Sequence, residues 1–189
     1  AVELYEREPP QDSAHQFGHD QGGGAYWHLS IPLLFLGRCD AAAAAGAHAS
    51  SLARDLNNAT TGAYDSLWAA FTSLERGDWE AARAISEAMI ESAVERSMLL
   101  WAVFGRHILG SALAPLGEAE AAIEMIRLGR DQARQISNAI FEPMTLRFEA
   151  QALAALGRAD EALVCLGEAL DTVEATGERW WEAEIHRLR

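Results

Sequence analysis

The sequence contains no lysine, so all 15 basic residues among its 189 positions are arginine. A Walker A phosphate loop and a pyridoxal Schiff base each require a lysine side chain. Positive charge is also scarce, because 28 acidic residues leave a formal net charge of −13 at pH 7. Nucleic-acid affinity depends on clustered basic residues that neutralise phosphates. We therefore expect neither a P-loop ATPase nor a nucleic-acid partner.

Long apolar runs and cysteine are scarce as well. No apolar run approaches the roughly 18 residues of a membrane-spanning helix, and no basic-then-apolar leader opens the sequence. We therefore expect a soluble, cytoplasmic protein without a membrane partner. The two cysteines, Cys39 and Cys165, match no metal-ligand spacing, and we expect both to be buried free thiols.

Alanine, by contrast, is abundant, with 37 residues. It is the strongest helix former and permits close contacts between helices. Glycines recur at a period of forty residues, at Gly37, Gly77, Gly117 and Gly157. Each of them separates an apolar segment from an alanine-rich one, as in LERGDWEAA at residues 74–82. The pattern predicts four helix pairs with a bend at each glycine.

Other positions keep a fixed distance from these glycines. Seven residues before them stand Ser30, Ala70, Gly110 and Ala150, and five residues after them Ala42, Ala82, Ala122 and Ala162. Such small residues let two successive helices approach closely. Three residues after the glycines stand Asp40, Glu80, Glu120 and Asp160, in a first helical turn where the helix dipole favours an acid.

The expected fold is therefore all-α, a right-handed superhelical array of antiparallel helix pairs with about forty residues per repeat. The expected parts are an N-terminal segment 1–20, repeats at 21–57, 58–97, 98–137 and 138–177, and a truncated fifth repeat or capping helix at 178–189. The small-residue pattern resembles tetratricopeptide (TPR) repeats, whose usual period is about 34 residues. HEAT-like arrays share the longer period but lack this pattern, so they are the second choice.

Two prolines and an alanine run bear on this prediction. Pro32 lies in the middle of the first expected helix and should kink it or break its hydrogen bonding. Pro143 suits the first turn of a helix. The alanine-rich stretch 39–55 should be a tightly packed helix rather than a low-complexity tail.

The stretch HQFGHDQGGG at residues 15–24 invites a catalytic interpretation, because His15 and His19 stand four residues apart and such a pair on a helix can share a zinc ion. However, Gly18 separates the histidines and no third ligand is evident, while the glycines follow no strand and no lysine accompanies them. We favour a structural role, with Asp20 as a helix N-cap and the glycines packed against a neighbouring helix. We expect no catalytic residues, no metal and no cofactor.

A family resemblance comes from both ends of the chain. The stretch LYEREPPQDSAHQFGHDQGGGAYWHLSIPLLFLGRCDAA and the later GERWWEAEIHRLR resemble the C-terminal TPR-like region of large bacterial signalling proteins. In those proteins a class III adenylate/guanylate cyclase domain and an ATPase module of the AAA or STAND type precede this region. The resemblance implies that any catalysis belongs to those other domains.

A partner-binding groove is expected on the first helices of the repeats, by analogy with TPR geometry. Its proposed contacts are Trp27, Tyr64, His107, Arg147 and Gln151. Aromatic anchors would lie at one end, and His107 and Arg147 would grip an acidic part of a peptide at the other. The competing interpretation places such residues in the core between repeats.

Three functions remain open at this stage. The favoured one is a non-catalytic regulatory array that binds a protein or peptide segment, for example the ATPase or cyclase domain of the same chain. The second is a small-molecule sensor array, as in a STAND-type transcriptional regulator or kinase. The third is a hydrolase that uses His15, His19 and Asp20.

Overall fold

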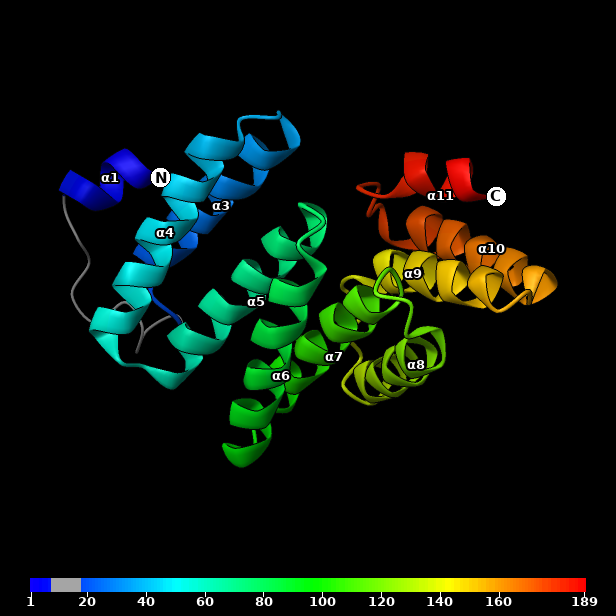
Figure 1. Ribbon diagram of the computed structural model, residues 1–189. Coiled ribbons are helices and arrows are strands. Elements are labelled where there is room, and N and C mark those ends of the chain that lie inside the picture. The colour runs from blue at the N-terminus through cyan, green and yellow to red at the C-terminus, as the bar shows by residue number, and fades with distance from the viewer. Residues whose placement is uncertain (8–17) are drawn as a thin grey trace. The chain divides into compact units, whose positions relative to one another are not determined.

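The computed structural model describes residues 1–7 and 18–189, and all regular structure within them is α-helical. This confirms the all-α, TPR-like helical-repeat prediction (Figure 1). The helices are α1 (Val2–Arg7), α3 (Gln21–Phe35), α4 (Cys39–Leu56), α5 (Ala59–Glu75), α6 (Trp79–Glu95), α7 (Leu99–Leu113), α8 (Ala119–Gln135), α9 (Glu142–Ala155), α10 (Ala159–Thr176) and α11 (Glu182–Leu188).

The four periodic glycines lie at the predicted bends. Gly37, Gly77, Gly117 and Gly157 have φ values of 73°, 77°, 85° and 74°, a left-handed conformation that glycine adopts without a steric penalty. The residue after each glycine donates its N–H to a carbonyl five residues back, as from Arg38 to Leu33 and from Arg158 to Leu153. Each bend is therefore the same Schellman-type helix end.

A second left-handed bend also recurs every forty residues, where one helix pair gives way to the next. It falls at Asn57, Ser97, Ser137 and Gly177, with φ values of 46°, 56°, 53° and 74°. Only the last of these is a glycine, so composition did not reveal the bend. Asparagine tolerates this conformation better than serine does, because its side chain can hydrogen-bond locally.

The small residues pack between the helices as predicted. All eight at the two conserved distances from the bend glycines are buried. In the first pair the hydroxyl of Ser30 donates to the carbonyl of Ala42 at 2.8 Å. In the third, a Cβ on Gly110 would lie only 3.2 Å from the carbonyl oxygen of Ala122. The acidic residues also lie in the first turns of α4, α6, α8 and α10.

One expectation is confirmed in part and one is wrong. The helix α3 continues through Pro32 to Phe35, while the missing N–H of Pro32 leaves the carbonyl of His28 without the usual helical donor, as predicted. Cys39 is exposed, because it is the first residue of α4, directly after the bend; Cys165 is buried as expected. Pro143 does lie in the first turn of α9, and the alanine run forms α4.

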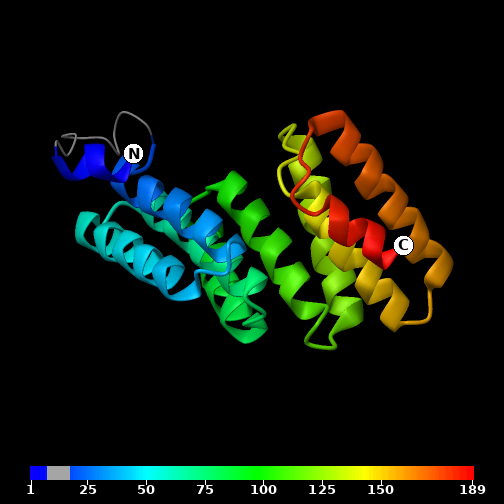
Figure 2. The same ribbon diagram turned by 90° about the horizontal axis from the view of Figure 1, so that it is seen from above.

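The chain divides into two compact units, and each is described by itself. Unit 1 is Ala1–Thr72 and unit 2 is Ser73–Arg189. In unit 1, α3 packs along α4 around Tyr26, Trp27, Ala45 and Ala49. In unit 2, α7 packs on α6 and α8, and α9 packs on α8 and α10 (Figure 2). Within the described residues, no helix is both long and apolar enough to span a membrane.

Candidate functional site

Unit 1 carries four neighbouring rings that we call the histidine–aromatic cluster: His19, His28, Tyr64 and Trp68. His19 stacks on Tyr64 with 4.1 Å between ring centroids and an interplanar angle of 8°. The Tyr64 hydroxyl lies 3.1 Å from His28 Nε2, and the rings of His28 and Trp68 meet edge to face at 5.8 Å. His28 is exposed and the others are half-buried. The cluster therefore presents ring surface to solvent, where apolar or cationic groups of a partner could pack.

The start of α3 holds this cluster in place. Asp20 is the N-cap, and its Oδ2 accepts a 2.7 Å hydrogen bond from the N–H of Gly23. The N–H of Asp20 in turn donates to the hydroxyl of Thr61 on α5 at 3.1 Å. Gly22 packs closely against α1, because a Cβ there would overlap the ring of Tyr5. The structural role predicted for Asp20 and the glycines is confirmed.

Trp27 lies beneath this surface, in the core of unit 1, with 4% of its area exposed. Its indole N–H donates to Oδ1 of Asp65 at 2.9 Å, and the Ser50 hydroxyl donates to the same oxygen at 2.8 Å. Burial raises the pKa of Asp65, although both donors and the charge of Arg54 oppose that shift. The surroundings of Trp27 therefore match the competing interpretation, which placed such residues in the core.

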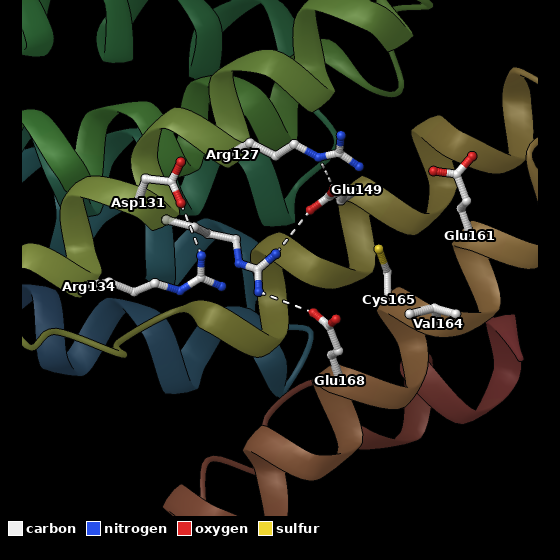
Figure 3. Close-up of a pocket in the computed structure, with 9 residues that line it drawn as sticks. Arg127, Asp131, Arg134, Glu149, Glu161, Val164, Cys165 and Glu168 are labelled. Atoms are coloured by element: carbon white, nitrogen blue, oxygen red, sulfur yellow. Dashed lines mark hydrogen bonds and ion pairs between the residues drawn. The ribbon is translucent and has the colours of Figure 1, made fainter.

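Unit 2 carries a different feature, a charged cluster on α8, α9 and α10 (Figure 3). Glu149 of α9 is 1% exposed and accepts from Arg127 Nε at 2.6 Å and Arg130 Nη1 at 3.3 Å. Arg130 is 9% exposed and also pairs with Glu142 at 3.1 Å and with Glu168 at 3.4 Å. One buried guanidinium therefore joins three helices, because its planar donors serve several carboxylates at once.

A cavity of about 380 Å³ adjoins this cluster. Arg127 and Arg130 line it from α8, while Glu161, Cys165 and Glu168 line it from α10. Burial, reinforced by the nearby glutamates, raises the pKa of the Cys165 thiol to about 11, so the thiol stays protonated and weakly nucleophilic. The cavity thus has polar walls, and its charged groups are largely paired with one another.

Arg147, the predicted basic anchor, lies in unit 2 with 9% of its area exposed. Its Nη2 is 3.5 Å from Oε1 of Glu75, an oxygen that also accepts from the indole of Trp181 at 3.3 Å. The guanidinium carbon lies 4.3 Å above the ring of Phe148. Burial lowers the pKa of Arg147, and the charge of Glu75 opposes that shift.

The remaining predicted groove residues differ in exposure. His107 is 1% exposed, its ring lies against Gly129 of α8, and burial lowers its pKa to about 4, so the side chain is neutral at pH 7. Gln151 is half-buried and lines a second, apolar cavity. The structure thus brings Trp27 and Tyr64 together in unit 1. A binding role for these residues stays a prediction.

The catalytic interpretation of the N-terminal stretch gains no support from the described residues. His15 lies outside them, His19 is stacked on a tyrosine, and Asp20 is used as a helix cap. Among the residues that the structure describes, no group of three or more His, Cys, Asp or Glu side chains is placed to hold a metal ion.

The charged cluster of unit 2 was not predicted from the sequence. A signal was present, because Arg127, Arg130 and Arg134 follow one another at helical spacings of three and four, which places them on one face of α8. Two of them, Arg127 and Arg130, pair with Glu149. The arginine spacing could indicate a charged face of α8, but it could not identify the acid that this face meets.

Comparison with known proteins places this architecture among helical repeats. A scan against models of protein families finds none that matches. The chain is 26% identical over 189 residues to the uncharacterized protein R02095 of Rhizobium meliloti (strain 1021), and the match covers 98% of this chain but 18% of that protein. The chain therefore spans less than a fifth of the length of that relative.

The fold is also similar to the crystal structure of the apo form of RapI. That match has a TM-score of 0.69 at 12% sequence identity and covers 97% of this chain and 64% of RapI. At this identity the likeness concerns the fold, which is a TPR-like helical repeat.

Proposed function

We propose that this chain is a non-catalytic TPR-like interaction and regulatory region of a larger bacterial signalling protein. Its partner is a protein or peptide segment, and the ATPase or cyclase domain of the same polypeptide is the first candidate. The observation that carries the proposal is the match to a much longer relative. That match covers 98% of this chain but only 18% of the relative's length. Helical-repeat arrays of this kind present extended surfaces for other proteins.

The histidine–aromatic cluster is the proposed contact surface in unit 1. It combines an exposed His28 with the half-buried rings of Tyr64 and Trp68, and aromatic side chains of this kind dominate many protein interfaces. The groups around it are fixed by the Asp20 cap and its bond to Thr61. A rigid surface loses little conformational entropy when a partner binds.

The test measures association between this chain and the rest of the same polypeptide, produced separately, by isothermal titration calorimetry. We expect His28→Ala and Tyr64→Ala each to weaken binding about tenfold, which is about 1.4 kcal/mol. Leu29→Ala is the matched control, because Leu29 is an exposed residue of α3 outside the cluster. Association that is absent, or equal in all four proteins, would contradict the proposal. Circular dichroism verifies that each variant is folded.

A small-molecule sensor is the second candidate, and the polar cavity of unit 2 favours it. Guanidinium groups on α8 and carboxylates on α10 line its volume of about 380 Å³, and a zwitterionic compound that offers both charges could replace their ion pairs. Thermal unfolding in the presence of free amino acids tests this candidate. A rise in midpoint that Glu168→Gln abolishes would support it, and no rise with any of them would exclude this ligand class.

A further inference from the structure

Arg106 of α7 is a half-buried arginine of unit 2 that pairs with no acid among the described residues. Its Nη1 is buried and makes no hydrogen bond with them. Burial alone lowers the pKa of Arg106, whereas nearby carboxylates oppose this effect of burial at Arg130 and Arg147. Desolvation of an unpaired charge is unfavourable, so the Arg106 guanidinium lowers the stability of the fold without a compensating ion pair.

Two glycines hold α7 tightly between its neighbours at this point. A Cβ on Gly105 would lie 2.7 Å from Cγ1 of Ile90 on α6. On the other side, a Cβ on Gly129 of α8 would lie 3.2 Å from the Cβ of Arg106. The stem of the Arg106 side chain is therefore fixed where α7 meets α8. A partly exposed guanidinium on a fixed stem loses little conformational freedom when it binds a ligand.

The forty-residue register shows that the fold does not require a charge at this position. The equivalent residues of the four repeats are Tyr26, Ser66, Arg106 and Leu146. Tyr26 is 8% and Leu146 is 0% exposed, so neutral side chains fill the position in other repeats. Arginine in a protein interior is ordinarily paired. An unpaired arginine at a position that packing fills with leucine indicates a role outside packing.

A carboxylate is the anion that fits Arg106 best. One planar guanidinium offers two parallel N–H donors, which match the two oxygens of a carboxylate. Elsewhere in unit 2, Arg83 pairs in this chemistry with Glu87 at 3.0 Å and Glu118 at 2.6 Å. Phosphate groups are recognised by clusters of arginines, whereas Arg130 on the neighbouring helix is already paired with three glutamates. The net charge of −13 also disfavours a doubly charged anion.

We propose that Arg106 is a binding site for a carboxylate group, supplied by an acidic side chain of the protein segment that this chain binds or by a free organic acid. The first of these sources rests on the proposed function. His107 and Arg147, from which the sequence predicted a grip on an acid, are 1% and 9% exposed. Arg106 is half-buried, so a ligand can reach its side chain.

The first experiment titrates the chain with sodium acetate, exchanged for sodium chloride at constant ionic strength. Nuclear magnetic resonance follows the Nε–H signals of the arginines, and Arg106→Lys identifies the signal of Arg106. We expect this signal to respond at an acetate concentration at least tenfold lower than the signal of Arg76, which is an exposed arginine. Equal responses of the two arginines, or a response of Arg106 to sodium phosphate at a lower concentration than to acetate, would overturn the inference.

Thermal unfolding without any ligand tests the same site independently. Arg106→Leu introduces the residue that Leu146 provides in the next repeat, and the midpoint should rise by about 2–4 °C because an uncompensated charge is removed. Arg130→Leu is the matched control and should lower the midpoint, because it removes one of the two ion pairs of the buried Glu149. A lower midpoint in Arg106→Leu would show that the fold itself stabilises this guanidinium, and it would contradict the inference.

Calorimetry against the rest of the polypeptide, produced separately, assigns the source of the carboxylate. If an acidic side chain of that partner supplies it, Arg106→Leu should weaken association about tenfold. Unchanged association together with a response to acetate would assign the site to a free organic acid. The acetate titration contains no protein partner, so its failure is distinct from failure of the proposed function.

Discussion

The two units share one repeat but stabilise their interior polar groups by different means. In unit 1, the buried Asp20 and half-buried Asp65 accept hydrogen bonds from neutral donors, which are a backbone amide, an indole and a hydroxyl. In unit 2, the buried Glu149 is held by two guanidinium groups. Glycine bends and small contact residues recur in both units. The repeat thus determines the backbone, while positions outside the repeating pattern determine the chemistry of each interior.

The largest expected effect comes from removing the central acid of unit 2. Glu149→Ala removes the most buried partner of Arg130, and we expect a loss of about 3 kcal/mol of unfolding free energy, the lower end of the range for breaking a buried ion pair, because Glu142 and Glu168 still compensate part of the charge. Urea denaturation measures the loss. Glu161→Ala is the control, because Glu161 is exposed and pairs with Arg158 on the surface, where such pairs contribute little to stability. Similar losses in the two variants would show that the buried ion pairs of Glu149 do not stabilise the interior of unit 2 more than a surface pair does.

The pH dependence of stability should distinguish a buried histidine in unit 2 from an exposed one in unit 1. Burial lowers the pKa of His107 to about 4, below the value of about 6.5 expected when the chain is unfolded. The native state thus takes up this proton less readily, so stability present above pH 6.5 is lost as the pH falls towards 4. This lowered pKa corresponds to about 3 kcal/mol of unfolding free energy.

Denaturation at pH 7.5, 5.5 and 4.5 measures this slope in the parent protein and in two variants. His107→Gln removes the titrating group and should flatten the curve relative to the parent. His28→Gln makes the same exchange at an exposed position of unit 1 and serves as the comparison. A slope that His107→Gln does not alter would assign the pH dependence to other groups.

A smaller effect is expected from the neutral hydrogen bonds of unit 1. Trp27→Phe removes the indole donor to Asp65, and because the half-buried Asp65 still accepts from Ser50, we expect a loss of about 1–2 kcal/mol. Hydrogen exchange of α3 and α4 reports the change within the unit. Asp65→Asn completes a double-mutant cycle, and the combined loss should be smaller than the sum of the two single losses. Additive losses would show that the hydrogen bond does not couple the pair.

The smallest effect is expected at the bend glycines. Both units contain this bend, so the effect should be the same in both. Gly37 and Gly157 have φ values of 73° and 74°, and alanine in a left-handed conformation costs about 1–2 kcal/mol. Gly37→Ala and Gly157→Ala should therefore lower the unfolding free energy by similar amounts. The controls are Gly62→Ala in α5 and Gly167→Ala in α10, where an added Cβ meets open space and helix propensity should raise stability by up to about 1 kcal/mol. Unequal losses at the two bends would mean that the repeats are not equivalent.

Much of the fold could be predicted because its determinants are local and periodic. Three kinds of position recur every forty residues, with Gly157, Ala42 and Asp160 as examples. The structure confirms the bend at the glycine, the close helix contact at the alanine and the acidic residue in the first helical turn. The effect of Pro32 is also local, because it removes one helical donor while α3 continues to Phe35. A single missing donor does not end a helix whose neighbouring residues Ser30 and Ile31 are buried, since tertiary packing outweighs local preference.

The candidate sites were less predictable because they depend on contacts distant in sequence. His19 is 45 residues from Tyr64, on which it stacks, and Arg147 is 72 residues from Glu75. Periodicity could place Tyr64 and Arg147 on equivalent helices, but it could not show which carboxylate or ring would meet them. The buried Glu149 was missed for the same reason, since its arginines lie on the preceding helix.

The second left-handed bend has a consequence for how such a chain can change in length. Because Ser97 and Ser137 adopt nearly the same φ, and the amides of Met98 and Asn138 reach equivalent carbonyls at Ala93 and Ala133, residues 98–137 form a cassette with matching ends. Excising that cassette would join Ser97 to Asn138 without altering the backbone at the junction. Duplication or loss of whole forty-residue cassettes would thus keep the same bend and the same backbone hydrogen bond at each junction.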